Sequence, residues 1–173
     1  MVKKKAIFFD RDGTLIKTKR KKNRPIAIKN IEECKIFPSV KWILKKLSKK
    51  YLLFIVTNQP DVFTKDNTKK NVLEINNFLK KKLPITKIFT CYCKNNKCNY
   101  RKPNIGMIIK AAQIYNLDLS KSFIIGDRWR DIHMGIKSGC KTVFIDKEYD
   151  EKLNYHPNYT IRFFFELKKI FKL

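Results

Sequence analysis

The sequence predicts an α/β fold: a Rossmann-like three-layer sandwich with a mostly parallel central sheet, in a single domain over residues 1–173. Short apolar runs typical of buried strands alternate with longer segments whose apolar residues recur at helical spacing. Elements that alternate in this way form a parallel sheet with helices on both faces. No inserted segment is long enough for a second domain, so we expect loops alone to cover the functional site.

The first half of the chain supplies three predicted strands and two predicted helices. Ala6-Ile7-Phe8-Phe9 is a short apolar run that predicts a buried strand. The basic segment that follows, to about Asn30, predicts a long loop, because Pro25 argues against regular helix. We then expect a helix that begins at 37–39, a strand over 51–56, a helix over 67–83 that Pro84 ends, and a strand over 85–90.

The second half continues the alternation. Gly139 is expected to end a helix, because a glycine adopts the left-handed conformation common just after a helix. The expected elements are a helix over 104–115 with Asn104 as its N-cap, a strand over 122–126, a helix that ends at Ser138, strands over 141–145 and 159–161, and a final helix over 165–170.

The composition is strongly basic, with 40 Lys and Arg against 15 Asp and Glu, a formal net charge of +25. The Lys residues are spread along the whole chain and accompany many Ile and Asn residues, a pattern that favours the compositional bias of an AT-rich genome over a nucleic-acid interface. The positive field would still favour an anionic substrate. The densest basic run lies within residues 17–30, which we expect to form a flexible loop.

The lengths of the apolar runs and the use of cysteine indicate in which cellular compartment the protein is expected. No apolar run approaches the roughly 18–20 residues that span a membrane, and the basic start is followed by an apolar run that breaks at Asp10. We therefore expect a cytoplasmic protein without a membrane partner, and no disulfide framework among its five cysteines. Cys34 and Cys140 are expected to be buried, and His133 and His156 to be structural or surface residues.

Two carboxylates follow the first strand. Asp10 and Asp12 are two residues apart, so an extended backbone would point both toward the same side, and Gly13 permits a sharp turn. Ligands of open α/β sheets bind beyond the carboxyl ends of the strands. We therefore expect both carboxylates to reach one small ligand.

Three further strand ends carry polar groups suited to a phosphoryl group. Phosphoryl transfer needs a nucleophile, a proton donor for the leaving oxygen and positive charge on the phosphoryl oxygens. Mg²⁺ takes oxygen ligands, typically carboxylates together with phosphate and water. The segments are Thr57-Asn58-Gln59, Arg101-Lys102-Pro103 and Gly126-Asp127-Arg128-Trp129-Arg130-Asp131.

In order and spacing, these four segments resemble the motifs of the haloacid dehalogenase (HAD) superfamily of phosphohydrolases, over about residues 5–146. A cysteine-rich loop directly before Arg101-Lys102-Pro103 makes the chain similar to the capless subfamily of heptose bisphosphate and histidinol-phosphate phosphatases. The resemblance implies a HAD-like fold without a large cap domain, and a phosphatase that depends on Mg²⁺.

The resemblance also implies a role for each motif residue. Asp10 would attack phosphorus and form an aspartyl-phosphate, and Asp12 would protonate the leaving oxygen and then activate water. Thr57 and Lys102 would hold the phosphoryl oxygens. The implied substrate-binding residues are Asn58, Gln59, Arg101 and Arg128. The implied Mg²⁺ ligands are Asp10, the backbone carbonyl of Asp12, and Asp127, with Asp131 orienting the metal's waters or neighbouring cations.

The cysteine loop, residues 91–100, departs from the family pattern. Cys91, Cys93 and Cys98 lie within eight residues, a spacing typical of metal ligands. The subfamily's zinc loop has four ligands, and here Tyr100 takes the place of the fourth. Either three thiolates and another ligand hold Zn²⁺, or the loop is a metal-free remnant.

The substrate is left open among several classes. The resemblance favours a small phosphorylated metabolite, with D-glycero-D-manno-heptose 1,7-bisphosphate first and histidinol phosphate second. Polynucleotide 3′-phosphatases share the Asp-x-Asp-Gly-Thr and Thr-Asn-Gln motifs, so a nucleic-acid substrate is a further alternative. A non-enzymatic alternative is a degenerate module that binds phosphate or nucleic acid. An open site without a cap is compatible with a monomer.

Overall fold

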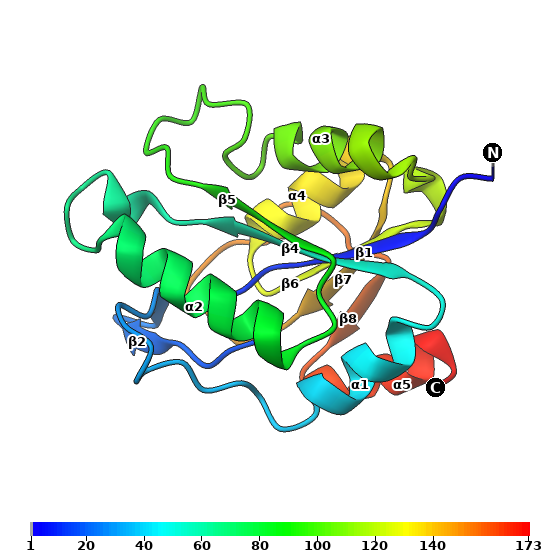
Figure 1. Cartoon of the computed structure of the whole chain (residues 1–173), viewed down its shortest axis with the longest axis horizontal. Coiled ribbons are helices and arrows are strands. Elements are labelled where there is room, and N and C mark those ends of the chain that lie inside the picture. The colour runs from blue at the N-terminus through cyan, green and yellow to red at the C-terminus, as the bar shows by residue number, and fades with distance from the viewer. Residues whose placement is uncertain (1) are drawn as a thin grey trace.

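The centre of the molecule is a six-stranded sheet in the order β5-β4-β1-β6-β7-β8 (Figure 1). The computed structural model describes residues 2–173, and every strand pair in this sheet is parallel. This confirms the predicted sheet. The strands are β1 (Ala6–Phe9), β4 (Leu52–Asn58), β5 (Lys87–Cys91), β6 (Phe123–Gly126), β7 (Lys141–Ile145) and β8 (Tyr159–Ile161).

Helices cover both faces of the sheet, as predicted. On one face α1 (Val40–Leu47), α2 (Lys69–Lys82) and α5 (Leu167–Phe171) pack against Ile7 and Phe9. On the other face α3 (Gly106–Tyr115) and α4 (Trp129–Ser138) pack against Ala6 and Phe8 (Figure 1). Successive side chains of β1 point to opposite faces of the sheet, and each face has its own apolar core. All four residues of β1 are therefore buried. Over residues 2–173 no helix is long and apolar enough to cross a membrane.

Several element boundaries differ from the prediction. β4 extends to Asn58, so Thr57 and Asn58 belong to the strand. Asn104 was expected to cap α3, but Ile105 occupies that position, and the Asn104 amide instead donates to the carbonyl oxygens of Asn96 and Cys98. Gly139 follows α4 in the left-handed conformation, with φ of 74°, as expected. Short 3₁₀ helices, at 60–62, 119–121 and 164–166, complete the connections.

The segment predicted as an unstructured basic loop contains a β-hairpin. β2 (Lys19–Lys21) pairs antiparallel with β3 (Arg24–Ile26). Lys22 and Asn23 form its turn, with φ of 49° and 52°, the left-handed values that a two-residue hairpin turn needs. Pro25 is accommodated because this ribbon has only two strands, so a proline can face away from the partner.

Candidate active site

Polar side chains gather at the carboxyl edge of the sheet, where β1, β4 and β6 end. They surround a pocket of about 90 Å³. Pro25 and Ala27 from the hairpin segment also lie in its wall, so this segment forms part of the site. The other lining residues are Asp10, Asp12, Thr57, Asn58, Lys102, Arg128, Arg130 and Asp131. Pro25, Ala27 and Arg130 were not among the candidate site residues of the sequence, and the other seven lining residues were.

Lys102 joins two of the carboxylates. Its Nζ lies 2.7 Å from Oδ1 of Asp10 and 2.7 Å from Oδ1 of Asp131, and it also donates to the Val56 carbonyl at 3.1 Å. Burial alone would lower the pKa of Lys102, but the charges of Asp10 and Asp131 outweigh it and raise the pKa. Lys102 therefore carries a fixed positive charge in the floor of the pocket.

Asp127, directly after β6, has a buried carboxylate whose negative charge is only partly balanced by hydrogen bonds. Thr14 donates its hydroxyl to Oδ1 at 3.1 Å, while Oδ2 is buried and makes no hydrogen bond of normal geometry within residues 2–173; the neighbouring Tyr149 hydroxyl only partly offsets its burial. Burial, together with the nearby charges of Asp10 and Asp131, raises the pKa of Asp127 well above its ordinary value. Burial also raises the pKa of Asp10. A cation at this position would remove the imbalance.

Three carboxylates lie close enough together to hold one divalent metal ion. Oxygen atoms of Asp10, Asp127 and Asp131 lie within 4.8 Å of one another, and all three residues are buried. Only one cationic side chain, Lys102, is paired with this group among the ion pairs of the described residues. Three carboxylates and one ammonium leave an excess of negative charge, and hard oxygen ligands of this kind suit Mg²⁺.

The start of α4 fixes Asp131. Its Oδ1 accepts from Lys102, and its Oδ2 accepts from the backbone N–H of Arg128 at 3.2 Å. The Arg128 guanidinium in turn pairs with Glu151, with an Nε–Oε2 distance of 2.9 Å. Asp131 therefore contacts a neighbouring cation, Lys102, and its orienting role stays a prediction.

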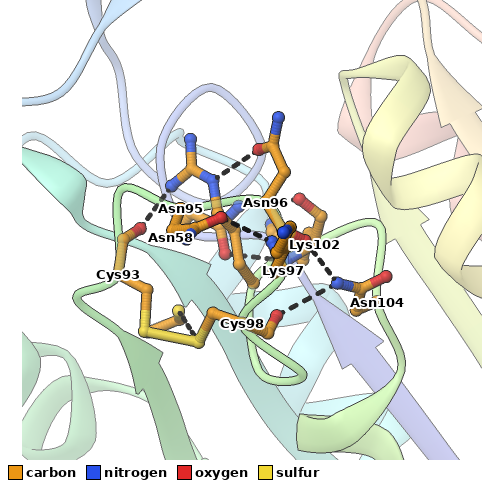
Figure 2. Close-up of a disulfide and its surroundings, with 10 residues drawn as sticks. Asn58, Cys93, Asn95, Asn96, Lys97, Cys98, Lys102 and Asn104 are labelled. Atoms are coloured by element: carbon orange, nitrogen blue, oxygen red, sulfur yellow. Dashed lines mark hydrogen bonds between the residues drawn. A yellow bond between two sulfur atoms is a disulfide. The ribbon is translucent and has the colours of Figure 1, made fainter.

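The two amides that follow Thr57 contact protein groups. Asn58 donates to the Lys102 carbonyl at 3.2 Å and accepts from the Lys102 N–H at 3.1 Å, a pairing visible in Figure 2. Gln59 donates to Thr57 Oγ1 at 2.9 Å and to Asp12 Oδ2 at 2.8 Å. Both residues were predicted to bind substrate, and in this structure their side chains hold other site residues.

Arg101 is anchored by the cysteine loop. Its guanidinium donates to the Cys93 carbonyl at 2.7 Å and to Asn96 Oδ1 at 3.2 Å. Arg101 is buried, and its side chain lies outside the lining of the pocket. The loop therefore determines where this cation lies relative to Lys102, the next residue.

The three loop cysteines lie together, as the zinc prediction requires, but two of them are bonded. Cys93 and Cys98 form a disulfide, and Cys91 Sγ lies 3.9 Å from Cys98 Sγ (Figure 2). This single bond lies within one loop, and Cys34, Cys91 and Cys140 are free, so the described cysteines form no disulfide framework between elements. Three thiolates exist only in the reduced loop, and no His, Asp or Glu of the described chain joins the cluster as a fourth ligand. Cys140 is buried and Cys34 half-buried.

Two buried polar residues of the site were not predicted from the sequence. Arg11 lies between the two motif carboxylates, and its guanidinium contacts Asp12 with an Nη2–Oδ2 distance of 3.0 Å. Asn76, within the apolar face of α2, accepts from Arg11 Nη1 at 3.0 Å. A polar residue in an otherwise apolar helical stripe was the only sequence signal for Asn76.

Fold and site together define a phosphatase of the HAD superfamily, and comparison with known proteins gives the family. A family model described as polynucleotide kinase 3 phosphatase matches residues 5–161. The chain belongs to this family.

Curated relatives are similar over most of the chain. The D-glycero-alpha-D-manno-heptose-1,7-bisphosphate 7-phosphatase of Campylobacter jejuni is 31% identical over 153 residues, which cover 85% of each chain. The histidine biosynthesis bifunctional protein HisB of Bacteroides fragilis is 28% identical over 156 residues, 86% of this chain and 41% of that protein.

A solved structure shares the fold. The D,D-heptose 1,7-bisphosphate phosphatase of B. bronchiseptica, complexed with magnesium and phosphate, superimposes with a TM-score of 0.70 at 23% identity. The match covers 81% of this chain and 79% of that one. It confirms the HAD-like fold predicted from the motifs.

Proposed function

We propose that this phosphatase is a Mg²⁺-dependent phosphomonoester hydrolase that works through an aspartyl-phosphate on Asp10, and that its substrate is a sugar phosphate of the heptose 1,7-bisphosphate type. The observation that carries the mechanism is the buried contact of Lys102 with Asp10 and Asp131 in a pocket of about 90 Å³. The similarity to the C. jejuni enzyme, which covers 85% of both chains, supports the substrate.

In the first step, a carboxylate oxygen of Asp10 attacks phosphorus, and the bond from phosphorus to the leaving oxygen breaks. Oδ1 of Asp10 is bonded to Lys102, so Oδ2 is the oxygen free to attack. Asp12 gives its proton to the leaving oxygen, which departs as an alcohol.

In the second step, water attacks the phosphorus of the aspartyl-phosphate. Asp12, now ionised, takes a proton from this water, and the phosphorus–Asp10 bond breaks to release inorganic phosphate. Lys102 and the Thr57 hydroxyl stabilise the phosphoryl oxygens in both steps, since both line the pocket. Arg128, which lines the pocket, would recognise the rest of the substrate, whereas Arg101, bonded to Cys93 and Asn96, would act only by keeping the cysteine loop next to Lys102.

The residues that would hold Mg²⁺ are Asp10, Asp127 and the backbone carbonyl of Asp12, while Asp131 orients Lys102. The buried, unpartnered Oδ2 of Asp127 supports this assignment within the part of the chain described. When bound, the ion supplies positive charge to the phosphoryl oxygens. We expect EDTA to abolish hydrolysis and added Mg²⁺ to restore it.

The nucleophile is tested by Asp10→Asn. An amide cannot form the aspartyl-phosphate, so hydrolysis of p-nitrophenyl phosphate should fall by at least about 10³-fold, measured with Mg²⁺ present. Asp66→Asn is a matched control, because Asp66 is exposed, lies outside the pocket, and within residues 2–173 its side chain has one hydrogen bond, from Thr64. Activity that survives in the Asp10 variant would show that the assigned mechanism is wrong.

A polynucleotide 3′-phosphate is the second candidate substrate. The family model that matches residues 5–161 favours it, and the net charge of +25 suits this polyanion as it suits any anionic substrate. Turnover of heptose 1,7-bisphosphate, histidinol phosphate and a 3′-phosphorylated oligonucleotide should be compared at equal concentration. We expect the highest kcat/KM for the heptose bisphosphate, and exclusive turnover of the oligonucleotide would reject that substrate.

We propose zinc binding only for the reduced form of the cysteine loop, in which Cys93 and Cys98 are not bonded to each other. Cys91, Cys93 and Cys98 would supply three thiolates, and water or another group would complete the shell. Metal analysis of protein purified under reducing conditions decides it: about one zinc per chain supports the site, and none would leave a metal-free loop.

A further inference from the structure

Arg11 is a fully buried cation, and its partners connect it to the acid/base residue of the proposed mechanism. It is 0% exposed and is the largest fully buried side chain among residues 2–173. Burying a guanidinium without compensation is costly, so the hydrogen bonds of Arg11 must be retained for the fold to keep it there. Those bonds go to Asp12 and Asn76.

The two carboxylate oxygens of Asp12 have unequal partners. Oδ2 accepts from Arg11 Nε at 3.0 Å and from Gln59 Nε2 at 2.8 Å. Oδ1 has one long contact of 3.4 Å, with Arg11 Nη2. Two good donors therefore hold Oδ2, while Oδ1 is left available to carry a proton. The side chain of Asp12 is 13% exposed and lines the pocket.

Asn76 holds the far side of Arg11. Its Oδ1 accepts from Arg11 Nη1 at 3.0 Å, and its Nδ2 donates to Thr90 Oγ1 at 3.1 Å. An amide can accept and donate at once, so Asn76 links Arg11 to β5 from its place on α2. A chain of hydrogen bonds thus runs from β5 through α2 to the carboxylate of Asp12.

We propose that Arg11, held by Asn76, is the positioning residue that keeps Oδ2 of Asp12 fixed and presents Oδ1 to the leaving oxygen of the substrate. The inference rests on the proposed function, in which Asp12 is the general acid. Arg11 does not touch the substrate and acts only through Asp12. If Arg11 served the fold alone, its loss would lower activity equally for every phosphomonoester.

The test uses two phosphomonoesters whose leaving groups differ in their need for a proton. p-Nitrophenolate leaves readily without one, whereas the alkoxide of glycerol 2-phosphate requires one. kcat/KM is compared because it reports on the steps up to departure of the leaving group. General acid catalysis contributes about 10²- to 10⁴-fold. We expect Arg11→Met to lower kcat/KM for glycerol 2-phosphate by about 10²-fold, and for p-nitrophenyl phosphate by less than about tenfold.

Asn76→Ala is the milder second variant, which leaves the buried charge in place. We expect it to lower kcat/KM for glycerol 2-phosphate by about tenfold, because a small misplacement of Asp12 is enough. Asn67→Ala is its matched control. Asn67 is also a buried Asn and precedes α2, but it bonds Ile28 and Asn71 and has no path to Asp12. Its ratio of the two kcat/KM values should equal that of the wild type.

The outcomes separate the two proposals. Equal losses on both esters in the Asn76 variant, or the same selective loss in the Asn67 control, would overturn the positioning role. Thermal unfolding of each variant checks that it folds. If Arg11→Met does not fold, the ratio of kcat/KM values in Asn76→Ala decides whether Arg11 has the positioning role. A wild-type protein that hydrolyses neither ester with Mg²⁺ would instead overturn the proposed function.

Discussion

Gly126, the last residue of β6, allows the helix that follows it to approach the catalytic edge of the sheet. A Cβ at this position would lie 2.3 Å from Cγ of Asp131, well inside contact distance. Asp131 holds Lys102, and Lys102 holds Asp10. Asp131, Lys102 and Asp10 can therefore take their observed positions only because residue 126 has no side chain.

We predict that Gly126→Ala lowers phosphatase activity by at least about tenfold and destabilises the protein by about 1–3 kcal/mol, because Asp131 must shift to make room. Gly139→Ala is the control. A Cβ there meets open space, and the φ of 74° costs about 1–2 kcal/mol of strain without touching the site. Unchanged kcat in the Gly126 variant, measured beside the control, would contradict this account.

Residues at strand ends could be predicted from the sequence, because a parallel sheet brings the carboxyl ends of its strands to one edge. Asp10, Thr57 and Asp127 follow that rule, and they lie around one pocket or next to it. Arg11 could not be predicted in this way. Alternation along an extended chain turns it away from Asp10, toward α2, where its partner Asn76 is 65 residues distant in the sequence.

At the scale of elements, the β2–β3 hairpin is the main departure from the prediction. Its strands are charged and show no alternation of apolar residues, and its turn lacks glycine, so the usual hairpin signals are absent. Tertiary contacts stabilise it instead. The Asn23 amide donates to the Glu148 carbonyl at 2.7 Å, the Asp150 N–H donates to the Asn23 carbonyl at 3.2 Å, and Arg20 lies 5.0 Å from the centroid of the Tyr149 ring.

We predict that Asn23→Gly loosens the hairpin although glycine tolerates the turn, because the side-chain bonds of Asn23 to the Glu148 carbonyl and from Arg20 are lost. Amide hydrogen exchange of the peptide over residues 19–26 should then become faster. Lys22→Gly is the matched change, since it eases the left-handed φ of 49° and leaves the Asn23 contacts in place. Exchange that is faster in the Lys22 variant than in the Asn23 variant would show that the turn, and not the side-chain bonds of Asn23, holds the hairpin.

At the scale of the whole molecule, the net charge of +25 acts on stability as well as on substrates. Like charges repel in the compact state, and salt screens them over about 10 Å at 0.1 M and about 3 Å at 1 M. We predict that raising NaCl from 20 mM to 500 mM stabilises the protein by about 1 kcal/mol, an increase in Tm of about 3 °C. Thermal unfolding in chloride measures this, since phosphate would also bind the site. A Tm that falls with NaCl would refute the repulsion.

The fold as a whole was the most predictable property. Every strand of the large sheet except the short edge strand β8 has an apolar run, and helices such as α1 and α2 show a clear apolar stripe. The loop between β5 and α3 was the least predictable. Its conformation follows from a bond between Cys93 and Cys98 and from side-chain contacts of Asn96 and Asn104, none of which has a periodic signal.

The strand order has a consequence for how the chain is made. β1 is synthesised before the other five strands of its sheet, yet it lies between β4 and β6, and its Ala6 N–H donates to Ser122 Oγ, 116 residues later. At about 5–20 residues per second, roughly 6–23 s of translation separate these two residues. Throughout that interval the most apolar strand of the protein lacks one of its neighbours. Newly made chains are therefore most exposed to aggregation before β6 has been completed.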